Sequence, residues 1–408
     1  MSNNTQPEIR FPGFTEDWEE RKLRDITERV RGNDGRMDLP TLTISASSGW
    51  LDQRDRFSGN IAGKEQKNYT LLKKGQLSYN HGNSKLAKYG VVCELTTYDE
   101  ALVPRVYHSF DTNELASSNF IEYMFATKRP DRELAKLVSS GARMDGLLNI
   151  NFDEFMGINV SVPSVEEQQK IGTFFKQIDD TIALHQSKLD LLKETKKGFL
   201  QKMFPKNGAK VPEIRFPGFT EDWEERKWYD TVNMSTDMVD PKEGEYDDLP
   251  HIGPGNIESF TGRILNNVNT VREDNLISGK FHFNSGDIIY GKINPQLAKY
   301  AYVNFEGLTS ADTYVLKSHN GIIQDFLFVI LQTKDFYKYS VSVSMRTGMP
   351  KINRDELNQY NYLSPSNIDE QRKIGSFFNQ LDNTITLHQR KLDLLKETKK
   401  GFLQKMFV

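Results

Sequence analysis

Two long segments of the chain carry the apolar pattern of helices that pack along their length. In residues 166–204 and again in residues 366–408, apolar side chains recur at alternating spacings of four and three, which is the a/d repeat of a coiled coil. This seam consists of Ile171, Phe175, Ile178, Ile182, Leu189 and Leu192 in the first segment, and Ile374, Phe378, Leu381, Ile385, Leu392 and Leu395 in the second. Each segment predicts a helix of about 55–60 Å.

Four polar residues interrupt the seam at matching places, namely His185 and Lys196 in the first segment and His388 and Lys399 in the second. Buried polar a-positions fix the register of paired helices. Alternatively, the lysines lie near frayed helix ends and extend their ammonium groups into water, and for the lysines we favour this alternative. The two segments are expected to pack against each other in antiparallel orientation, because two similar halves favour a pseudo-twofold axis.

The seam segments belong to a chain that repeats itself. Residues 7–22 return letter for letter as residues 212–227, and residues 188–204 return as residues 391–407, whereas the stretches between these copies differ. Self-similarity of this kind indicates a duplicated architecture more strongly than local secondary-structure propensity can. A repeated scaffold that holds two unlike domains predicts a ligand with two unlike parts at a fixed spacing.

The unlike stretches have the mixed pattern of α+β domains. Short strand-like runs such as residues 90–93 and 313–316 stand between turn residues, and helical pieces follow at residues 120–125 and 323–333. We therefore expect a first domain over residues 1–163, a helix over 164–205, a second domain over 206–365 and a second helix over 366–408. Each domain should contain a twisted sheet flanked by helices.

Composition narrows the class of protein. With 37% hydrophobic and 27% charged residues in 408, the chain is long enough for two globular domains. No apolar run reaches the roughly 20 residues of a membrane span, and residues 1–6 lack a signal region, so a cytoplasmic protein is expected. Cys93 is the single cysteine, which excludes a disulfide framework and multi-cysteine zinc sites. The net charge of −3 means that any contact with phosphate must come from local basic clusters.

The sequence contains no convincing catalytic motif. Residues 294–297 (NPQL) lack the second proline and the aromatic residue of the amino-methyltransferase tetrapeptide, so a loop turn is the better interpretation. A Walker A loop is missing, and residues 65–67 (EQK) have the spacing of a nuclease site but no upstream Pro-Asp partner. The histidines form no zinc-binding pair. We expect a chain without catalytic activity, metal or cofactor of its own.

Basic and aromatic side chains recur at matching places in both halves. Arg and Lys contact phosphates and guanine edges, so this recurrence favours a DNA-binding surface over solvated loops. The candidates are Lys85, Lys88, Tyr89 and Arg143 in the first half, and Lys292, Lys299, Tyr300, Arg346 and Lys351 in the second.

Several motifs together resemble the specificity subunit of type I restriction-modification systems. They are the opening motif of residues 7–18, residues 286–295 (GDIIYGKINP), and the helix starts at residues 167–172 (EQQKIG) and 370–375 (EQRKIG). The resemblance spans the whole chain. It implies two tandem target-recognition domains, each of which reads one part of a split target in double-stranded DNA, separated by two long helices packed as an antiparallel coiled coil.

The resemblance also implies partners. Two modification subunits would bring S-adenosylmethionine and the adenine-methylating site, and restriction subunits would bring ATP, Mg²⁺ and DNA cleavage, whereas the specificity subunit is non-catalytic. Two other classes remain open: a fused DNA methyltransferase or nuclease, and a coiled-coil adaptor without DNA affinity. The unlike domains argue against an adaptor, because two identical partners would not require them.

Overall fold

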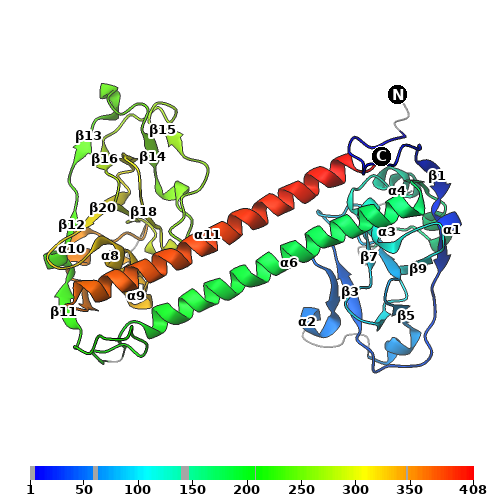
Figure 1. The fold of residues 1–408 in the computed structure, drawn as a ribbon, viewed down its shortest axis with the longest axis horizontal. Coiled ribbons are helices and arrows are strands. Elements are labelled where there is room, and N and C mark those ends of the chain that lie inside the picture. Colours follow the sequence, from blue (N-terminus) through cyan, green and yellow to red (C-terminus); the bar gives the residue numbers. More distant parts are fainter. Residues whose placement is uncertain (1–4, 58–62, 139–146, 207, 346–347) are drawn as a thin grey trace. The chain divides into compact units, whose positions relative to one another are not determined.

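The computed structural model describes residues 5–57, 63–138, 147–206, 208–345 and 348–408, and it divides into two compact units (Figure 1). Unit 1 contains residues 1–184 and 392–408, and unit 2 contains residues 185–391. Each unit holds one mixed α/β domain and one stretch of each long helix. The prediction of an α+β chain with two tandem domains is confirmed.

The domain of unit 1 is built on a four-stranded antiparallel sheet with strand order β2-β9-β6-β7. Its strands are β2 (Thr27–Arg29), β6 (Leu77–Asn80), β7 (Val91–Glu94) and β9 (His108–Thr112). The helices are α3 (Ser118–Ala126), α4 (Asp131–Leu137) and α5 (Phe152–Met156), and α3 packs against β7. A smaller core lies beneath two strand pairs, β3 (Leu42–Ser45) with β4 (Gly49–Asp52) and β5 (Thr70–Lys73) with β8 (Glu100–Val103). Helix α2 (Gln53–Phe57) and the 3₁₀ turn η1 (Gly63–Asn68) follow β4.

The domain of unit 2 repeats this central sheet with strand order β12-β20-β17-β18. Its strands are β12 (Val232–Met234), β17 (Ile288–Gly291), β18 (Tyr300–Tyr302) and β20 (Thr313–Ser318), and its helices are α8 (Gln324–Ile330), α9 (Lys334–Ser344) and α10 (Arg354–Asn358). The pairs Tyr79–His108 and Tyr290–Tyr314 occupy the same register in the two sheets. The duplication thus extends to domains whose sequences have diverged.

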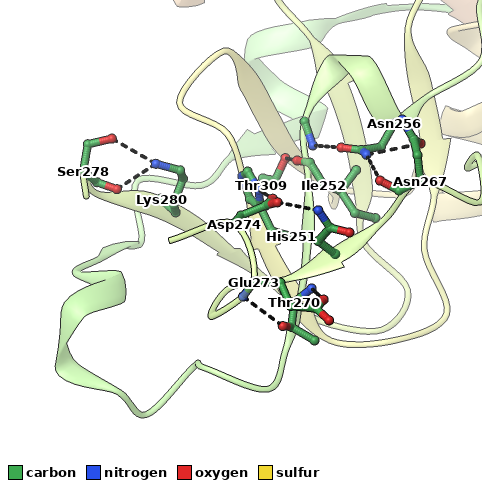
Figure 2. Close-up of polar contacts among 12 residues, drawn as sticks. His251, Ile252, Asn256, Asn267, Thr270, Glu273, Asp274, Ser278, Lys280 and Thr309 are labelled. Atoms are coloured by element: carbon green, nitrogen blue, oxygen red, sulfur yellow. Dashed lines mark hydrogen bonds and ion pairs between the residues drawn. The ribbon is translucent and has the colours of Figure 1, made fainter. Parts of the chain in front are cut away.

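Unit 2 also has a larger outer sheet. Its strands, in spatial order, are β13 (Met238–Val239), β16 (Lys280–Phe283), β19 (Gly307–Thr309), β14 (Pro250–Ile252) and β15 (Asn269–Thr270), and the short turns η2 (Pro241–Glu243), η3 (Pro254–Asn256) and η4 (Pro295–Leu297) connect elements of this domain. Figure 2 shows its polar contacts: the ring of His251 lies 2.6 Å from Asp274, and the buried Lys280 ammonium donates to Ser278. The outer sheet therefore distinguishes the second domain from the first.

The identical segments 7–22 and 212–227 each join one domain to both long helices, α6 (Val165–Lys202) and α11 (Ile368–Lys405). We call each of these two segments a strap. Each strap ends in a strand, β1 (Glu19–Lys22) in unit 1 and β11 (Glu224–Lys227) in unit 2. A helical turn of different sequence follows each strand, α1 (Leu23–Ile26) and α7 (Trp228–Thr231). Strand β1 pairs with β10 (Asn159–Val162), and β11 pairs with β21 (Asn361–Ser364). These ladders close each domain just before its helix starts.

Hydrogen bonds attach each strap to one helix start and one helix end. In unit 1, Arg10 forms a bidentate pair with the buried Glu167 at the start of α6, and Ile9 N–H donates to a carbonyl in the last turn of α11. In unit 2, Arg215 pairs with Glu370 at the start of α11, and Ile214 N–H donates to the last turn of α6. Charge-assisted bidentate bonds are short and directional, so the strap fixes the two helix ends relative to its own domain.

Within each unit the two long helices run antiparallel. In unit 1, Asp179 pairs with Lys399, and the rings of Phe174 and Phe402 meet edge to face. In unit 2, the rings of Phe199 and Phe377 meet in the same way. All twelve predicted seam residues are buried or half-buried. In the part of the chain that the structure describes, no helix has the length and apolar character needed to span a membrane.

The favoured interpretation of the seam lysines is wrong. Lys196 is 8% exposed, and its ammonium lies 2.5 Å from the carboxylate of Asp382. Lys399 forms the matching pair with Asp179 at 2.6 Å, and the rings of His185 and His388 meet at 3.0 Å. The lysines thus form ion pairs across the seam instead of extending into water, because an aspartate of the facing helix stands opposite each of them.

We predict that Lys196→Met lowers the free energy of unfolding by about 2 kcal/mol, because the variant removes the ammonium group that stabilises the buried carboxylate of Asp382. Burial alone raises the pKa of Asp382, and Lys196 acts in the opposite direction. Lys399→Met is the matched control with an expected loss of about 1 kcal/mol, since the side chains of that pair are more exposed. The double variant Lys196→Met/Asp382→Leu should regain most of the loss. Urea unfolding measures all three, and equal losses for the two single variants would contradict this account.

Candidate nucleic-acid interface

Each central sheet carries a cluster of side chains beside the end of its third strand in the order β2-β9-β6-β7 or β12-β20-β17-β18. His81 directly follows β6, and Lys292 directly follows β17. The carbonyl of His81 accepts a hydrogen bond from Leu148 N–H at 2.9 Å, and the carbonyl of Lys292 accepts the equivalent bond from Ile352 N–H at 3.0 Å. His81 and Lys292 thus occupy the same position in the two domains. We call Arg29, His81, His108 and Phe152 the first cluster, and Lys292, Tyr314, Lys351 and Arg354 the second cluster.

The second cluster places two cations against one aromatic ring and a third cation, Lys351, close enough to Lys292 to act on its charge. The Lys292 ammonium and the Arg354 guanidinium each lie 5.3 Å from the ring centre of Tyr314. Arg354 is held there by hydrogen bonds to the carbonyls of Met234 and Ser235 at 2.7 and 2.6 Å. Burial first, and then the like charge of the exposed Lys351, lower the pKa of Lys292, while Asp312 acts in the opposite direction. An anion bound here would relieve this repulsion.

The first cluster is a stack of rings beneath a single guanidinium. The exposed Arg29 lies 4.0 Å from the ring centre of Phe152, whose edge meets His108 at 5.6 Å. His108 in turn stacks on His81 at 4.9 Å with an interplanar angle of 12°. Burial lowers the pKa of His108 to about 4, so this imidazole is neutral near pH 7. Matching positions of the two domains therefore carry unlike chemistry.

Capped helix starts position both clusters. Asn151 and Asn353 each accept a hydrogen bond from the backbone N–H three residues later, at 2.9 Å, and form capping boxes with Glu154 and Glu356. Phe152 and Arg354 are consequently the first residues of α5 and α10. The site residues that the sequence did not predict are Arg29, His108, Phe152, Tyr314 and Arg354. The repeated Asn-x-Asp-Glu motif was a signal that could have located Phe152 and Arg354.

The structure brings together only some of the sequence-predicted residues. Lys292 and Lys351 meet in the second cluster, whereas Lys85 and Lys88 are exposed outside the first cluster, with the Lys88 ammonium 5.2 Å from the ring of Tyr89. Tyr89 is half-buried, and its carbonyl accepts the Tyr79 hydroxyl at 2.6 Å. Arg143 and Arg346 lie outside the described residues.

Two further candidates have structural roles in the second domain. Tyr300 is 3% exposed, belongs to the domain core and donates its hydroxyl to the carbonyl of Phe260 at 2.8 Å. A direct DNA contact by Tyr300 is therefore excluded, because its place on β18 turns the ring inward. Lys299 is half-buried and donates its ammonium to the carbonyl of Ile257.

The motifs that resemble catalytic ones have structural explanations. Asn294 and Ala298 both have left-handed backbone conformations, with φ of 51° and 45°, at the two ends of a single 3₁₀ turn, η4. Residues 65–67 lie within η1. Among the residues that the structure describes, no three His, Cys, Asp or Glu side chains are grouped to hold a metal ion.

Comparisons with known proteins identify the family. The family model described as the type I restriction modification DNA specificity domain matches residues 15–194 and 220–397. The chain is 27% identical over 273 residues to the type I restriction enzyme EcoDI specificity subunit of Escherichia coli, a match that spans 60% of this chain and 60% of that subunit's length. It is 23% identical over 302 residues to the MjaVIII specificity subunit of Methanocaldococcus jannaschii, over 69% and 68% of the two chains.

Among solved structures, the type I restriction-modification system S subunit from M. genitalium has the same fold, with a TM-score of 0.63, 12% identity and 99% of both chains covered. The two family matches together include most of the sequence, each with one central sheet and one cluster. The chain therefore belongs to the type I restriction-modification DNA specificity domain family, of which it carries two tandem copies.

Proposed function

We propose that this chain is the non-catalytic specificity subunit of a type I restriction-modification complex. In this proposal the first domain reads one part of a bipartite double-stranded DNA target, the second domain reads the other part, and the paired helices set the spacing. The observation that supports it most strongly is the pair of matching but chemically unlike clusters on one repeated scaffold. An adaptor that binds two identical partners would not require two unlike clusters.

The chemistry of the clusters suits nucleic acid. Lysines such as Lys292 and Lys351 can neutralise phosphates, and a guanidinium such as Arg29 can form the bidentate contacts that distinguish guanine. Other exposed candidates, Lys85 and Lys88, lie in the same domain as the first cluster. We place Arg143 and Arg346 in the DNA surface on sequence grounds alone.

Two modification subunits are the proposed partners of the repeated segments. The identical segments leave Leu191 and Leu394 exposed by 68% and 63%, and the matching Leu184 and Leu387 by 68% and 65%. The buried seam alone does not require these exposed leucines to be repeated, so their recurrence in both copies suits two copies of one partner. S-adenosylmethionine would be bound by these subunits, while ATP and Mg²⁺ would be bound by restriction subunits. The complex would act in the cytoplasm, where its DNA lies.

The test combines the chain with its modification subunit and maps methylated adenines in genomic DNA. We expect a target with two unlike halves at a fixed spacing, and no binding of S-adenosylmethionine by the chain alone in calorimetry. Stoichiometric cofactor binding would instead support a fused methyltransferase. Absence of DNA binding with the modification subunit present would support the adaptor.

We predict that Lys292→Ala and Lys351→Ala each reduce the salt dependence of DNA binding by the assembled complex. If each lysine neutralises one phosphate, the slope of log K against log salt should fall by roughly 0.9 per variant. Lys317→Ala is the control, because Lys317 lies on the same sheet but pairs with Asp287 at 3.4 Å. Unchanged slopes for both cluster variants, measured by fluorescence anisotropy over a salt series, would place the second cluster outside the interface.

A half-length chain is predicted to read a palindrome. Residues 1–206 retain both partners of the seam ion pair, Asp179 and Lys196, and keep the strap that can receive the helix end of a second copy, since residues 188–204 and 391–407 are identical. Two copies can therefore pair as the helices of the intact chain do, with true twofold symmetry. With the modification subunit, this fragment should methylate an inverted repeat of the first half-site. Sedimentation that shows only monomer, or methylated sites without symmetry, would refute the prediction.

A further inference from the structure

A tight turn leads into the last strand of each central sheet. In the first domain it consists of residues 104–107, ahead of β9, and in the second domain of residues 310–313, at the start of β20. In both turns the N–H of the fourth residue donates to the carbonyl of the first residue at 3.0 Å. The residue after each turn, His108 or Tyr314, belongs to a cluster. The two turns therefore occupy equivalent places beside the two clusters.

The second turn is fixed by buried hydrogen bonds. Thr309 and Thr313 are fully buried, and their hydroxyl groups lie 2.8 Å apart. The Thr309 hydroxyl donates to the carbonyl of Ile252 at 2.6 Å (Figure 2). The carbonyl of Asp312 accepts the N–H of Lys292 at 3.0 Å, which joins the turn to the second cluster. A turn held in this way presents its side chains to a ligand in one arrangement, so little conformational entropy is lost on binding.

The first turn is fixed by different contacts. The buried Tyr107 places its hydroxyl 3.0 Å from the hydroxyl of Thr43, and the same oxygen accepts the N–H of Ile44 at 3.3 Å. The carbonyl of Val106 lies 3.0 Å from Nε2 of His81, a member of the first cluster. Both turns are thus anchored to their domain and to the neighbouring cluster.

Each turn carries one charged side chain, and the two charges are opposite. Arg105 is the second residue of the first turn, Asp312 is the third residue of the second turn, and both are exposed. Within the described ranges of the chain, no side chain forms a hydrogen bond or ion pair with the Arg105 guanidinium or the Asp312 carboxylate. Both charged groups are therefore open to a ligand.

A phosphate ligand alone does not explain the carboxylate of Asp312. Lys292, Lys351 and Arg354 give the second cluster three positive charges that attract DNA, whereas a carboxylate repels phosphate. A carboxylate at this place is favourable when it faces a hydrogen-bond donor of the DNA. In the major groove these donors are the exocyclic amino groups, N4 of cytosine and N6 of adenine.

We infer that Asp312 reads the amino group of cytosine or adenine in the second half-site, and that Arg105 reads guanine in the first half-site. The inference rests on the proposed function and deepens it, because it names residues that distinguish one base from another. A carboxylate accepts a hydrogen bond from a base amino group, and a guanidinium donates two hydrogen bonds to O6 and N7 of guanine. Opposite charges at equivalent turns thus give the two domains different base preferences.

The test measures binding of the assembled complex to duplexes in which each base pair of the mapped target is replaced in turn. In the second half-site, one position on one strand should accept cytosine or adenine and reject guanine and thymine by about tenfold or more. Asp312→Ala should remove this discrimination and keep that at every other position, which also shows that the variant is folded. Asp248→Ala removes another exposed carboxylate of the second domain and should keep the whole pattern.

Arg105→Ala should lose discrimination at one guanine of the first half-site and leave the second half-site unchanged. Its matched control is Arg54→Ala, because the exposed Arg54 pairs with Asp52 at 3.0 Å. Uniform weakening on every duplex with a smaller salt slope would make Arg105 a phosphate contact and overturn its assignment.

For Asp312→Ala, discrimination retained at every position would overturn the inference. The same conclusion would follow if this variant bound all duplexes more tightly by one common factor, because the carboxylate would then only repel phosphate. Both results leave the proposed function intact. That function fails, and the inference with it, if the wild-type complex distinguishes no DNA sequences.

Discussion

The seam between the long helices is the constraint on which the rest of this structure depends. A helix stripe of Ile, Leu and Phe requires an apolar partner, and in each unit that partner is the other copy of the same sequence. The ion pair across the seam occurs once in each unit, with lysine at the C-terminal part of one helix and aspartate in the N-terminal half of the other. Because both copies contain both partners, register and antiparallel direction are encoded in a single repeated segment.

The straps connect this constraint to the two globular domains. Each strap binds one helix start through an Arg–Glu pair and one helix end through a backbone hydrogen bond, and then opens the domain with a strand. Parts of a domain that do not contact the helices can diverge without disturbing them, whereas residues such as Tyr123, whose hydroxyl donates to Asp179, connect the domain directly to its helix. Accordingly the two domains share a central sheet but differ in the outer sheet and in the clusters at the ends of β6 and β17.

The architecture could be predicted from sequence because its signals are local and repeated. Heptad spacing identified the seam from Ile171 onward, and duplication supplied the antiparallel partner. The clusters were only partly predictable, since Arg29, His108 and Phe152 come from β2, β9 and α5, and only sheet pairing brings them together. Tyr300 was predicted as a DNA contact because basic and aromatic residues recur there in both halves, whereas strand β18 turns its ring into the core. The role of Lys196 was missed because the approach of Asp382 is a tertiary contact.

In the proposed function, the two domains determine the two halves of the DNA target, and the shared scaffold does not. The most direct test exchanges domains within the chain, replacing residues 23–158 by residues 228–360, which are bounded by equivalent ladders. Methylation mapping of this variant with the modification subunit should give an inverted repeat of the second half-site at the natural spacing. Retention of the first half-site, or an asymmetric target of new sequence, would contradict the account.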